Sequence, residues 1–285
     1  MNDLGQTVPC LRPKPVLVLG TDDVASAVGH ALAGAGIAAL LARDSDLPAL
    51  RRGMSFDDAL EHGSAWIDGV TAYAVDGPLD LAPDIRLGVT ALPVRELLDP
   101  TLVAGVIDAR MRRRPNSPDL RGALCFAIGL GPGFTAGGCV DVAVETEPDV
   151  VGRIVTQGGT RPAPGHASIL GGVGAERFGH APRSGVWWTF RDIGETVAAG
   201  AVIGLCDGMQ VAAPLDGRLR GLVRRGSAVR AGMRLLEIDP RLEVSQCHGL
   251  CPRAAGIAAA TLAALHMVWQ PQRLALPQEL TRWLM

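Results

Sequence analysis

The N-terminal half of the chain alternates short apolar runs with polar and glycine-rich turns. Residues 15–19 form an apolar, β-branched run that ends at Gly20, a helical pattern follows to about Gly34, and residues 37–41 have the pattern of a second buried strand. A strand, a tight turn, a helix and a strand in this order are typical of a parallel α/β sheet. We therefore expect a Rossmann-like α/β domain with a parallel sheet over residues 13–165, with further strands near residues 103–107, 123–128, 140–145 and 151–155.

A shorter pattern is repeated nearer the C-terminus. A shift of 32 residues aligns Ala181-Pro182-x-x-Gly185 with Ala213-Pro214-x-x-Gly217, and the following G-x-x-V-x-A-G string with its second copy at residues 226–232. Two copies are too few for a solenoid, whereas short strands between glycine turns indicate a small pseudo-symmetric β structure. The pattern resembles the barrel-sandwich hybrid of biotinyl and lipoyl domains. We expect such an all-β module over residues 178–240 and a C-terminal helical segment over residues 241–285.

The hairpin between the two repeats lacks the residue that a carrier domain needs. Biotinyl and lipoyl domains attach their cofactor to a lysine at this hairpin, which here is Cys206-Asp207-Gly208-Met209-Gln210. The single lysine of the chain is Lys14. The sequence therefore predicts that the protein carries no biotin and no lipoate. A docking or packing role is expected, with attachment through Cys206 as the alternative.

Composition and charge narrow the function classes. An apolar content of 48% with 20% charged residues is ordinary for a soluble globular protein, and a net charge of −2 provides no field that would recruit nucleic acid or an anionic membrane. The apolar stretch 24–42 is interrupted by His30 and glycines, so it reads as helix, turn and strand. Six scattered cysteines and no recognisable signal peptide favour a cytoplasmic protein without nucleic-acid or membrane partners. A homo-oligomer stays open.

The first turn has the position of a dinucleotide-binding fingerprint but not its composition. Gly20-x-Asp22-x-x-Ala25 stands where G-x-G-x-x-G/A is expected, and the middle glycine, which admits a pyrophosphate, is replaced by an acid. Asp22 would repel phosphate unless a metal or a proton intervened. The acid expected after the second strand is also displaced, because Arg43 precedes Asp44. The pattern favours a Rossmann-like frame without tight NAD binding, and an NAD(P)-dependent oxidoreductase is the competing hypothesis.

A glycine-rich loop follows the strand predicted at 123–128. Consecutive glycine N–H groups at the carboxyl end of a strand permit the close approach of an anion, at the place where open α/β sheets bind ligands. No Gly-Lys-[Ser/Thr] follows, so the loop is not a Walker A motif. A purely structural turn is the alternative. The candidate cofactor-binding residues of this loop are Gly129, Gly131, Gly133, Phe134, Thr135 and Gly137.

Charged residues follow the strand predicted at 103–107. Asp108, Arg110 and the arginines 112–114 come directly after it, and the ends of parallel strands lie on one edge of a sheet. Arginine forks beside glycine N–H groups suit a phosphorylated ligand such as a molybdopterin nucleotide. Arg51 and Arg52 are candidates for the same surface, and a solvated basic face is the alternative.

The only closely spaced cysteines form the string Cys247-His248-Gly249-Leu250-Cys251. Two further ligands at a suitable spacing are not evident, so we assign no metal site. Cys251 precedes Pro252, where a helix begins that is predicted to run to about Trp269, and a thiolate at a helix N-terminus is stabilised by the dipole. Two partly buried, unreactive cysteines are the alternative.

The order of these motifs resembles the YqeB-type family, described as selenium-dependent molybdenum hydroxylase system proteins and distantly like xanthine dehydrogenase accessory proteins. The resemblance spans about residues 15–265 and is carried by R-R-x-x-S-F at residues 51–56, V-I-D-A-R-M at 106–111, I-G-L-G-P-G-F-T-A-G at 128–137, G-R-I-V at 152–155 and I-D-P-R at 238–241.

The resemblance implies an accessory role in maturing or supplying a molybdenum hydroxylase, which would be the partner. Asp23 matches the acid of the family's first turn, whereas the other residues of that turn differ. Cys247 aligns with a cysteine of the family, which implies a catalytic, sulfur- or selenium-handling role. We therefore expect an accessory protein that binds a nucleotide or molybdopterin-type cofactor, with an NAD(P)-dependent oxidoreductase or a non-catalytic docking scaffold as alternatives.

Overall fold

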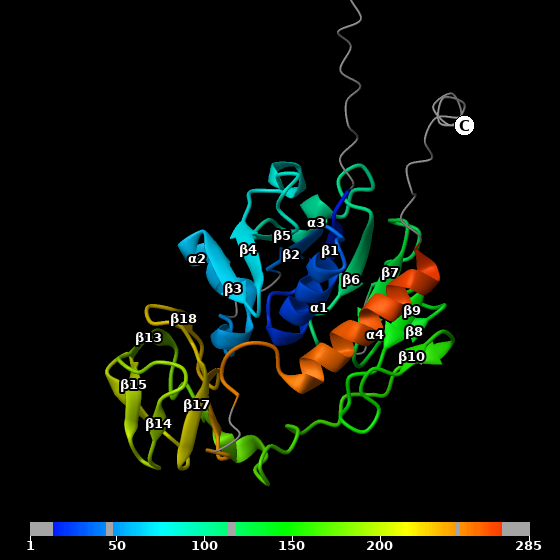
Figure 1. Ribbon diagram of the computed structural model, residues 1–285. Helices are drawn as coiled ribbons and strands as arrows, with labels where there is room; N and C mark the ends of the chain where they lie inside the picture. The colour runs from blue at the N-terminus through cyan, green and yellow to red at the C-terminus, as the bar shows by residue number, and fades with distance from the viewer. Residues whose placement is uncertain (1–13, 44–47, 113–117, 243–245, 270–285) are drawn as a thin grey trace, which may run out of the picture.

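The computed structural model describes residues 14–43, 48–112, 118–242 and 246–269, and its centre is a large, mostly parallel β-sheet. The sheet has nine strands in the order β10-β9-β7-β6-β1-β2-β5-β4-β3, of which β3 and β10 at the two edges are antiparallel to their neighbours (Figure 1). The expected α/β class with a mostly parallel sheet is therefore confirmed. The strand bounds are β1 (Val16–Leu19), β2 (Ala39–Ala42), β3 (Ser64–Ile67), β4 (Val70–Ala74), β5 (Leu87–Thr90), β6 (Gly105–Asp108), β7 (Ala127–Leu130), β9 (Val142–Val144) and β10 (Ile154–Val155).

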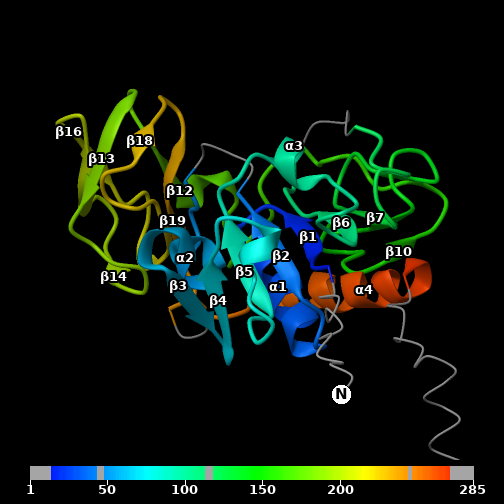
Figure 2. The same cartoon turned by 90° about the horizontal axis from the view of Figure 1, so that it is seen from above.

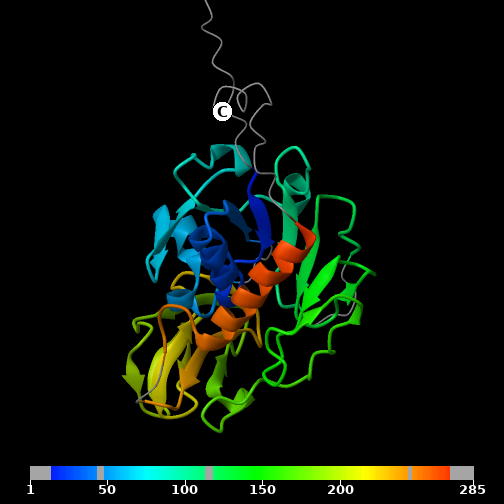
Figure 3. The same cartoon turned by 45° about the vertical axis from the view of Figure 1, so that its right-hand side comes forward.

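Two long helices cover one face of the sheet. Helices α1 (Asp23–Gly34) and α4 (Pro252–Val268) lie side by side there, and α3 (Val94–Leu97) lies on the opposite side of the strands (Figures 2 and 3). Alternate side chains of β1 enter the two apolar layers, with Val16 and Val18 under the helices and Leu17 and Leu19 on the other face. All four are fully buried, which explains why this strand reads as a continuous apolar run.

The predicted strand at 123–128 is displaced toward the C-terminus. Strand β7 begins at Ala127 and includes Gly129 and Leu130, which we had placed in the loop. Gly129 is paired in register with Ala143 of β9. The first part of the glycine string is therefore sheet, because its backbone groups are used by the neighbouring strand.

The sheet reverses its strand order beside β1. The chain passes from β1 through α1 to β2 and β5 on one side, and then returns to place β6 on the other side of β1. The connections that leave the carboxyl ends of the neighbouring strands β1 and β6 therefore run in opposite directions along the sheet. In open α/β sheets the crevice at this switch point is where ligands bind.

The second part of the described chain is built from two four-stranded antiparallel sheets, β12-β19-β17-β14 and β16-β15-β13-β18. A shift of 32 residues, the length of the sequence repeat, superimposes each strand of one sheet on a strand of the other in the sequence. The two sheets therefore have the same strand order and are related by the repeat. The bounds are β12 (Phe178–His180), β13 (Gly185–Thr189), β14 (Thr196–Val197), β15 (Val202–Cys206), β16 (Met209–Ala212), β17 (Gly217–Leu222), β18 (Ala228–Val229) and β19 (Arg234–Asp239).

Paired glycines explain the sequence repeat. Gly194 and Gly226 have φ angles of 96° and 86°, and Gly200 and Gly232 have φ angles of 79° and 77°. Residues with a Cβ rarely adopt these angles, so the same turn requires glycine in both copies. The predicted hairpin is present as well, because β15 and β16 pair through a tight turn at residues 207–208.

The remaining elements are short. They include α2 (Ala59–His62), η1 (Arg52–Met54), η2 (Phe56–Asp58), η3 (Pro78–Asp80) and η4 (Ala175–Arg177), together with a two-stranded sheet of β8 (Thr135–Ala136) and β11 (Gly158–Gly159). Helix α4 begins at Pro252, as expected, with Cys251 as its N-cap. Across the described ranges, no helix has the length and apolarity to cross a lipid bilayer.

Candidate functional site

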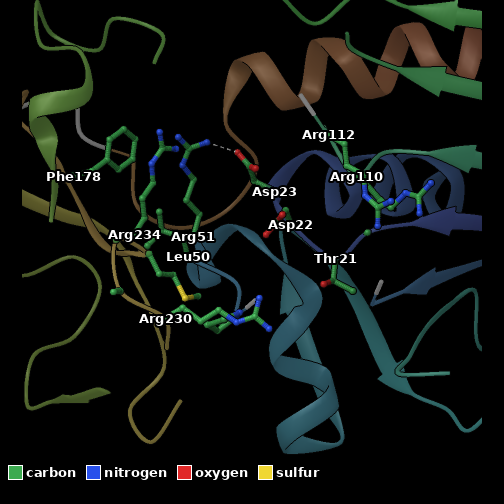
Figure 4. Close-up of a pocket in the computed structure, with 15 residues that line it drawn as sticks. Thr21, Asp22, Asp23, Leu50, Arg51, Arg110, Arg112, Phe178, Arg230 and Arg234 are labelled. Atoms are coloured by element: carbon green, nitrogen blue, oxygen red, sulfur yellow. Dashed lines mark hydrogen bonds and ion pairs between the residues drawn. The ribbon is translucent and has the colours of Figure 1, made fainter. Parts of the chain in front are cut away.

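A pocket of about 700 Å³ opens at the switch point of the large sheet. It is lined by the turn 20–23 after β1, by Arg110 and Arg112 after β6, by residues 230–234 from the β18–β19 turn and the start of β19, and by Arg51 (Figure 4). Segments from both parts of the molecule therefore form one cavity. Five of the lining residues are arginines, and two of them, Arg51 and Arg110, form ion pairs with neighbouring carboxylates.

The turn after β1 is held rigidly by a buried hydrogen-bond network. The Thr21 hydroxyl donates to Asp57 Oδ1 over 2.7 Å, and the Ser55 hydroxyl donates to the Thr21 carbonyl over 2.6 Å. Asp57 also accepts two hydrogen bonds from Arg43, at 2.8 and 2.7 Å. Ser55 and Asp57 of the S-F-D string at residues 55–57 thus hold the turn at Thr21, which lines the pocket, in place.

Gly20 allows this turn to pack closely between strand and helix. Its φ angle is 112°, and an added Cβ would lie 3.3 Å from the Ala25 Cβ and 3.4 Å from the Ala109 carbonyl oxygen. A side chain would therefore meet both a strained backbone conformation and neighbouring atoms. Gly20 has the role of the first glycine of a dinucleotide fingerprint, which is to permit the tight turn.

A chain of buried ion pairs joins the two parts of the molecule at the edge of the pocket. Arg51 donates to Asp23 Oδ2 over 2.8 Å and to Glu237 Oε2 over 2.7 Å, and Arg177 donates to Glu237 Oε1 over 2.9 Å. Burial opposes the ionisation of Asp23 and of Glu237, but the attraction of Arg51 outweighs it and lowers the pKa of both carboxyl groups. These acids are therefore ionised and matched by arginine.

Asp22 has a different environment. It is the N-cap of α1, its side chain makes no capping hydrogen bond, and it is exposed toward the pocket. Protein surrounds it on its other sides, and this desolvation, together with the nearby carboxylates of Asp23 and Asp57, raises the pKa of Asp22 to about 6. A carboxyl group with a shifted pKa in a cleft is a recognised mark of a functional site.

Arginines line the pocket on two sides. Arg110 is fixed by Asp108, whose Oδ1 accepts from Arg110 Nε over 2.8 Å and whose Oδ2 accepts from Arg110 Nη2. On the other side the Arg234 guanidinium lies 4.0 Å from the centre of the Phe178 ring, a cation–π contact. Arg230 comes from the β18–β19 turn and is exposed.

The predicted site residues are thus only partly brought together. Gly20, Asp23 and Arg110 line the pocket, and Asp108 lies behind Arg110 as its orienting partner. Arg51 also lines it, whereas Arg52 faces away and pairs with Asp58. Arg113, Arg114 and Asp44 fall outside the described residues.

The glycine loop does not have the geometry that we expected. Within the described chain, no residue of 129–138 lines this pocket. Several of its N–H groups have internal partners: Gly131 donates to the Val144 carbonyl, Gly137 to the Val140 carbonyl, Phe134 to the Thr160 hydroxyl and Thr135 to the Cys139 sulfur.

Packing of Phe134 accounts for a further part of the glycine string. The buried Phe134 ring lies where a Cβ of Gly129 would be, at 2.3 Å. Gly131 and Gly133 both have φ angles of 90°, so the turn itself requires glycine there. These contacts favour the structural turn over a preformed anion site for Gly129, Gly131, Gly133, Phe134, Thr135 and Gly137.

Cys247 lies in another part of the molecule. Its side chain is buried, and its carbonyl oxygen packs over Gly53, where an added Cβ would approach it to 2.4 Å. Cys251 is also buried. Within the described residues, no group of histidine, cysteine and acidic side chains is arranged to hold a metal ion.

Sequence reasoning missed the contribution of the β-module to the pocket. Arg230 and Arg234 occupy positions that are Ala198 and Val202 in the first repeat. Basic residues that appear in only one copy of a repeat break its symmetry, and that difference is the signal that could have revealed them.

No family model matches the chain. The chain is similar to a curated protein of Escherichia coli (strain K12), the uncharacterized protein YqeB, with 28% identity over 257 residues. The alignment covers 89% of this chain and 47% of YqeB, so the chain spans about half the length of the relative that it matches. The similarity supports a YqeB-like chain along nearly its whole length.

Proposed function

We propose that the protein binds a phosphate-bearing nucleotide or molybdopterin-type cofactor in the switch-point pocket. The observation that carries the proposal is the convergence of five arginines on the place where open α/β sheets bind their ligands. Guanidinium groups bind phosphate oxygens through charged, directional hydrogen bonds. Asp22 lies in the same cavity, and its raised pKa of about 6 means that its carboxyl group changes charge near this pH.

The biological role that we propose is assistance in the maturation of a molybdenum hydroxylase, in the cytoplasm. This part rests on the YqeB-type resemblance of the motifs. Cys247 would handle sulfur or selenium as a separate site, because it is buried and does not line the pocket. In the same proposal, residues 178–240 form a barrel-sandwich-type module that completes the pocket and carries neither biotin nor lipoate.

Calorimetry on the purified full chain tests the binding proposal. Pyrophosphate and cytidine diphosphate, which contains the cytidine and the pyrophosphate of a molybdopterin cytosine dinucleotide, are expected to bind, and Arg230→Ala should weaken both. Arg225→Ala is the matched control, since Arg225 is an exposed arginine outside the pocket lining. Lack of binding by these probes and by NADP would refute the proposal.

An exposed apolar face supports a docking scaffold as the second candidate. Trp188 and Phe190 are 55% and 68% exposed, and Trp188 is paired in register with the exposed Leu205. Apolar side chains gathered on a surface are typical of protein contacts. The test is a pull-down of the hydroxylase with the wild type and with the double variant Trp188→Ser, Phe190→Ser. If the double variant no longer binds the hydroxylase but still binds phosphate, docking is favoured over cofactor binding as the main role.

An NAD(P)-dependent oxidoreductase is the remaining candidate, and it is supported by the β1–α1–β2 opening with Gly20 at its turn. Asp22 stands where the pyrophosphate of such a cofactor would lie, which opposes this function. NADPH added to the protein should give no change in absorbance at 340 nm with candidate substrates. A cofactor-dependent change that Asp22→Gly enhances would establish the oxidoreductase instead.

A further inference from the structure

Apart from the Arg51–Asp23 ion pair, the charged side chains that line the pocket fall into three zones. Arg110 and Arg112 stand at one end, Arg230 and Arg234 at the other, and Asp22 lies between them (Figure 4). Each zone belongs to a different segment: the connection after β6, the β18–β19 turn with the first residue of β19, and the turn between β1 and α1. The order along the cavity is therefore positive, acidic, positive.

The middle zone is unsuitable for a phosphate. Asp23 is matched by Arg51, whereas the carboxyl group of Asp22 has no hydrogen bond or ion pair with any described residue. When ionised, it repels an anion placed over the Gly20 turn, and the carboxylates of Asp23 and Asp57 nearby add to this repulsion. A hydroxyl or amino group of a ligand would instead donate a hydrogen bond to it.

We infer that the pocket takes an elongated ligand with an anionic group at each end and hydroxyl or amino groups between them. This inference rests on the proposed binding function and specifies its ligand class. The cavity of about 700 Å³ is within the range of small-molecule sites, which is roughly 300–1,000 Å³. Because the two basic zones belong to different parts of the fold, such a ligand bridges them.

Sugar phosphates are suitable probes of this class. Fructose 1,6-bisphosphate has two anionic ends and hydroxyls between them, fructose 6-phosphate has one anionic end, and hexane-1,6-diyl bisphosphate has two ends without hydroxyls. Calorimetry is to compare the three on the full chain and on Arg112→Ala and Arg230→Ala, which remove one arginine from each zone. Arg225→Ala again serves as the exposed control.

We expect fructose 1,6-bisphosphate to bind about tenfold more tightly than fructose 6-phosphate, the gain of one charge-assisted contact. Arg112→Ala and Arg230→Ala should each abolish that gain, whereas Arg225→Ala should preserve it. Asp22→Ala should weaken fructose 1,6-bisphosphate but not hexane-1,6-diyl bisphosphate, because only the former donates to the carboxyl group.

The outcomes separate this inference from the function on which it rests. Equal affinity for the sugar mono- and bisphosphates, or a gain that depends on only one of the two zones, would overturn the two-ended ligand while leaving phosphate binding intact. If Asp22→Ala changes the affinity for the two bisphosphates equally, Asp22 does not accept a hydrogen bond from the middle of the ligand. Absence of binding by every phosphate probe, including pyrophosphate and cytidine diphosphate, would overturn both proposals.

Discussion

Single glycines in the large sheet are explained by the side chains that pack against them. Gly129 leaves room for the Phe134 ring, because an added Cβ would lie 2.3 Å from Phe134 Cγ. Gly129→Ala is therefore expected to destabilise the protein by about 1–3 kcal/mol, as overpacking does in a filled core. Urea denaturation measures the loss. Gly34→Ala, at the end of α1 with open space around it, should be neutral or slightly stabilising, and an equal effect of both substitutions would contradict this packing.

Asp22 gives a prediction about pH. Its pKa is raised from 3.8 to about 6 in the folded protein, so the folded state binds more protons than the unfolded state between these values. Stability should therefore fall as the pH rises through this window. Asp22→Asn is expected to raise the thermal midpoint at pH 8 and to have little effect at pH 3.5. The control Asp84→Asn removes an exposed acid, and a gain from Asp22→Asn that is the same at both pH values would count against the shifted pKa.

The sequence identified residues better than their roles. Gly20, Asp23 and Arg110 line the pocket, and their position at the ends of strands could be read from the apolar pattern. The glycine loop was the strongest local signal, yet its contacts with Phe134 and Thr160 are determined by packing between distant segments. A cluster of glycines shows where the backbone needs positive φ angles or close contacts. It does not show whether the space left by the missing side chains is filled by a ligand or by a neighbouring aromatic ring.

At the scale of elements, buried ion pairs connect η1, α1 and β19. Glu237 is fully buried between Arg51 and Arg177, and its pKa is lowered by them against the effect of burial. Glu237→Gln would leave the buried guanidinium group of Arg177, and the partly exposed one of Arg51, without their shared counter-charge, which costs about 3–5 kcal/mol. Urea denaturation checks this value. Removing an exposed partner by Glu96→Gln should cost at most about 1 kcal/mol, and a comparable cost for both would refute the importance of burial.

Elements with strong periodic patterns were predicted correctly. Strand β1 and helix α4 agree with the sequence expectation, and the 32-residue repeat corresponds strand by strand to two interchanged sheets. Strand β7 was placed too early, since an apolar run alone does not show which of its residues a neighbouring strand will pair. The pairing partners of short strands depend on tertiary contacts that no local pattern contains.

At the scale of the whole molecule, the pocket lies between the parallel sheet and the β-module, so the sequence of neither part describes it. Arg230 and Arg234 reach the carboxyl end of β1 because α1, η1 and β19 are tied together through Arg51. A repeat that resembles a carrier domain thus contributes one wall of the pocket. The β-module lacks the lysine of a carrier domain and has Arg230 and Arg234 instead. Both differences agree with a module that forms a wall of the pocket, because such a module needs no lysine to attach a mobile cofactor.

A ligand that bridges the two parts should stabilise the whole fold. Binding to the folded state alone raises the free energy of unfolding by RT ln(1 + [L]/Kd), about 2.7 kcal/mol at a ligand concentration of 100 times Kd. We expect fructose 1,6-bisphosphate to raise the thermal midpoint of the wild type and of Arg225→Ala, and to have a smaller effect on Arg230→Ala at the same concentration. Differential scanning calorimetry measures this shift. The unfolding of the β-module should move together with that of the parallel sheet, since each supplies one end of the site; a shift confined to one of two separate transitions would show that the ligand contacts that part alone.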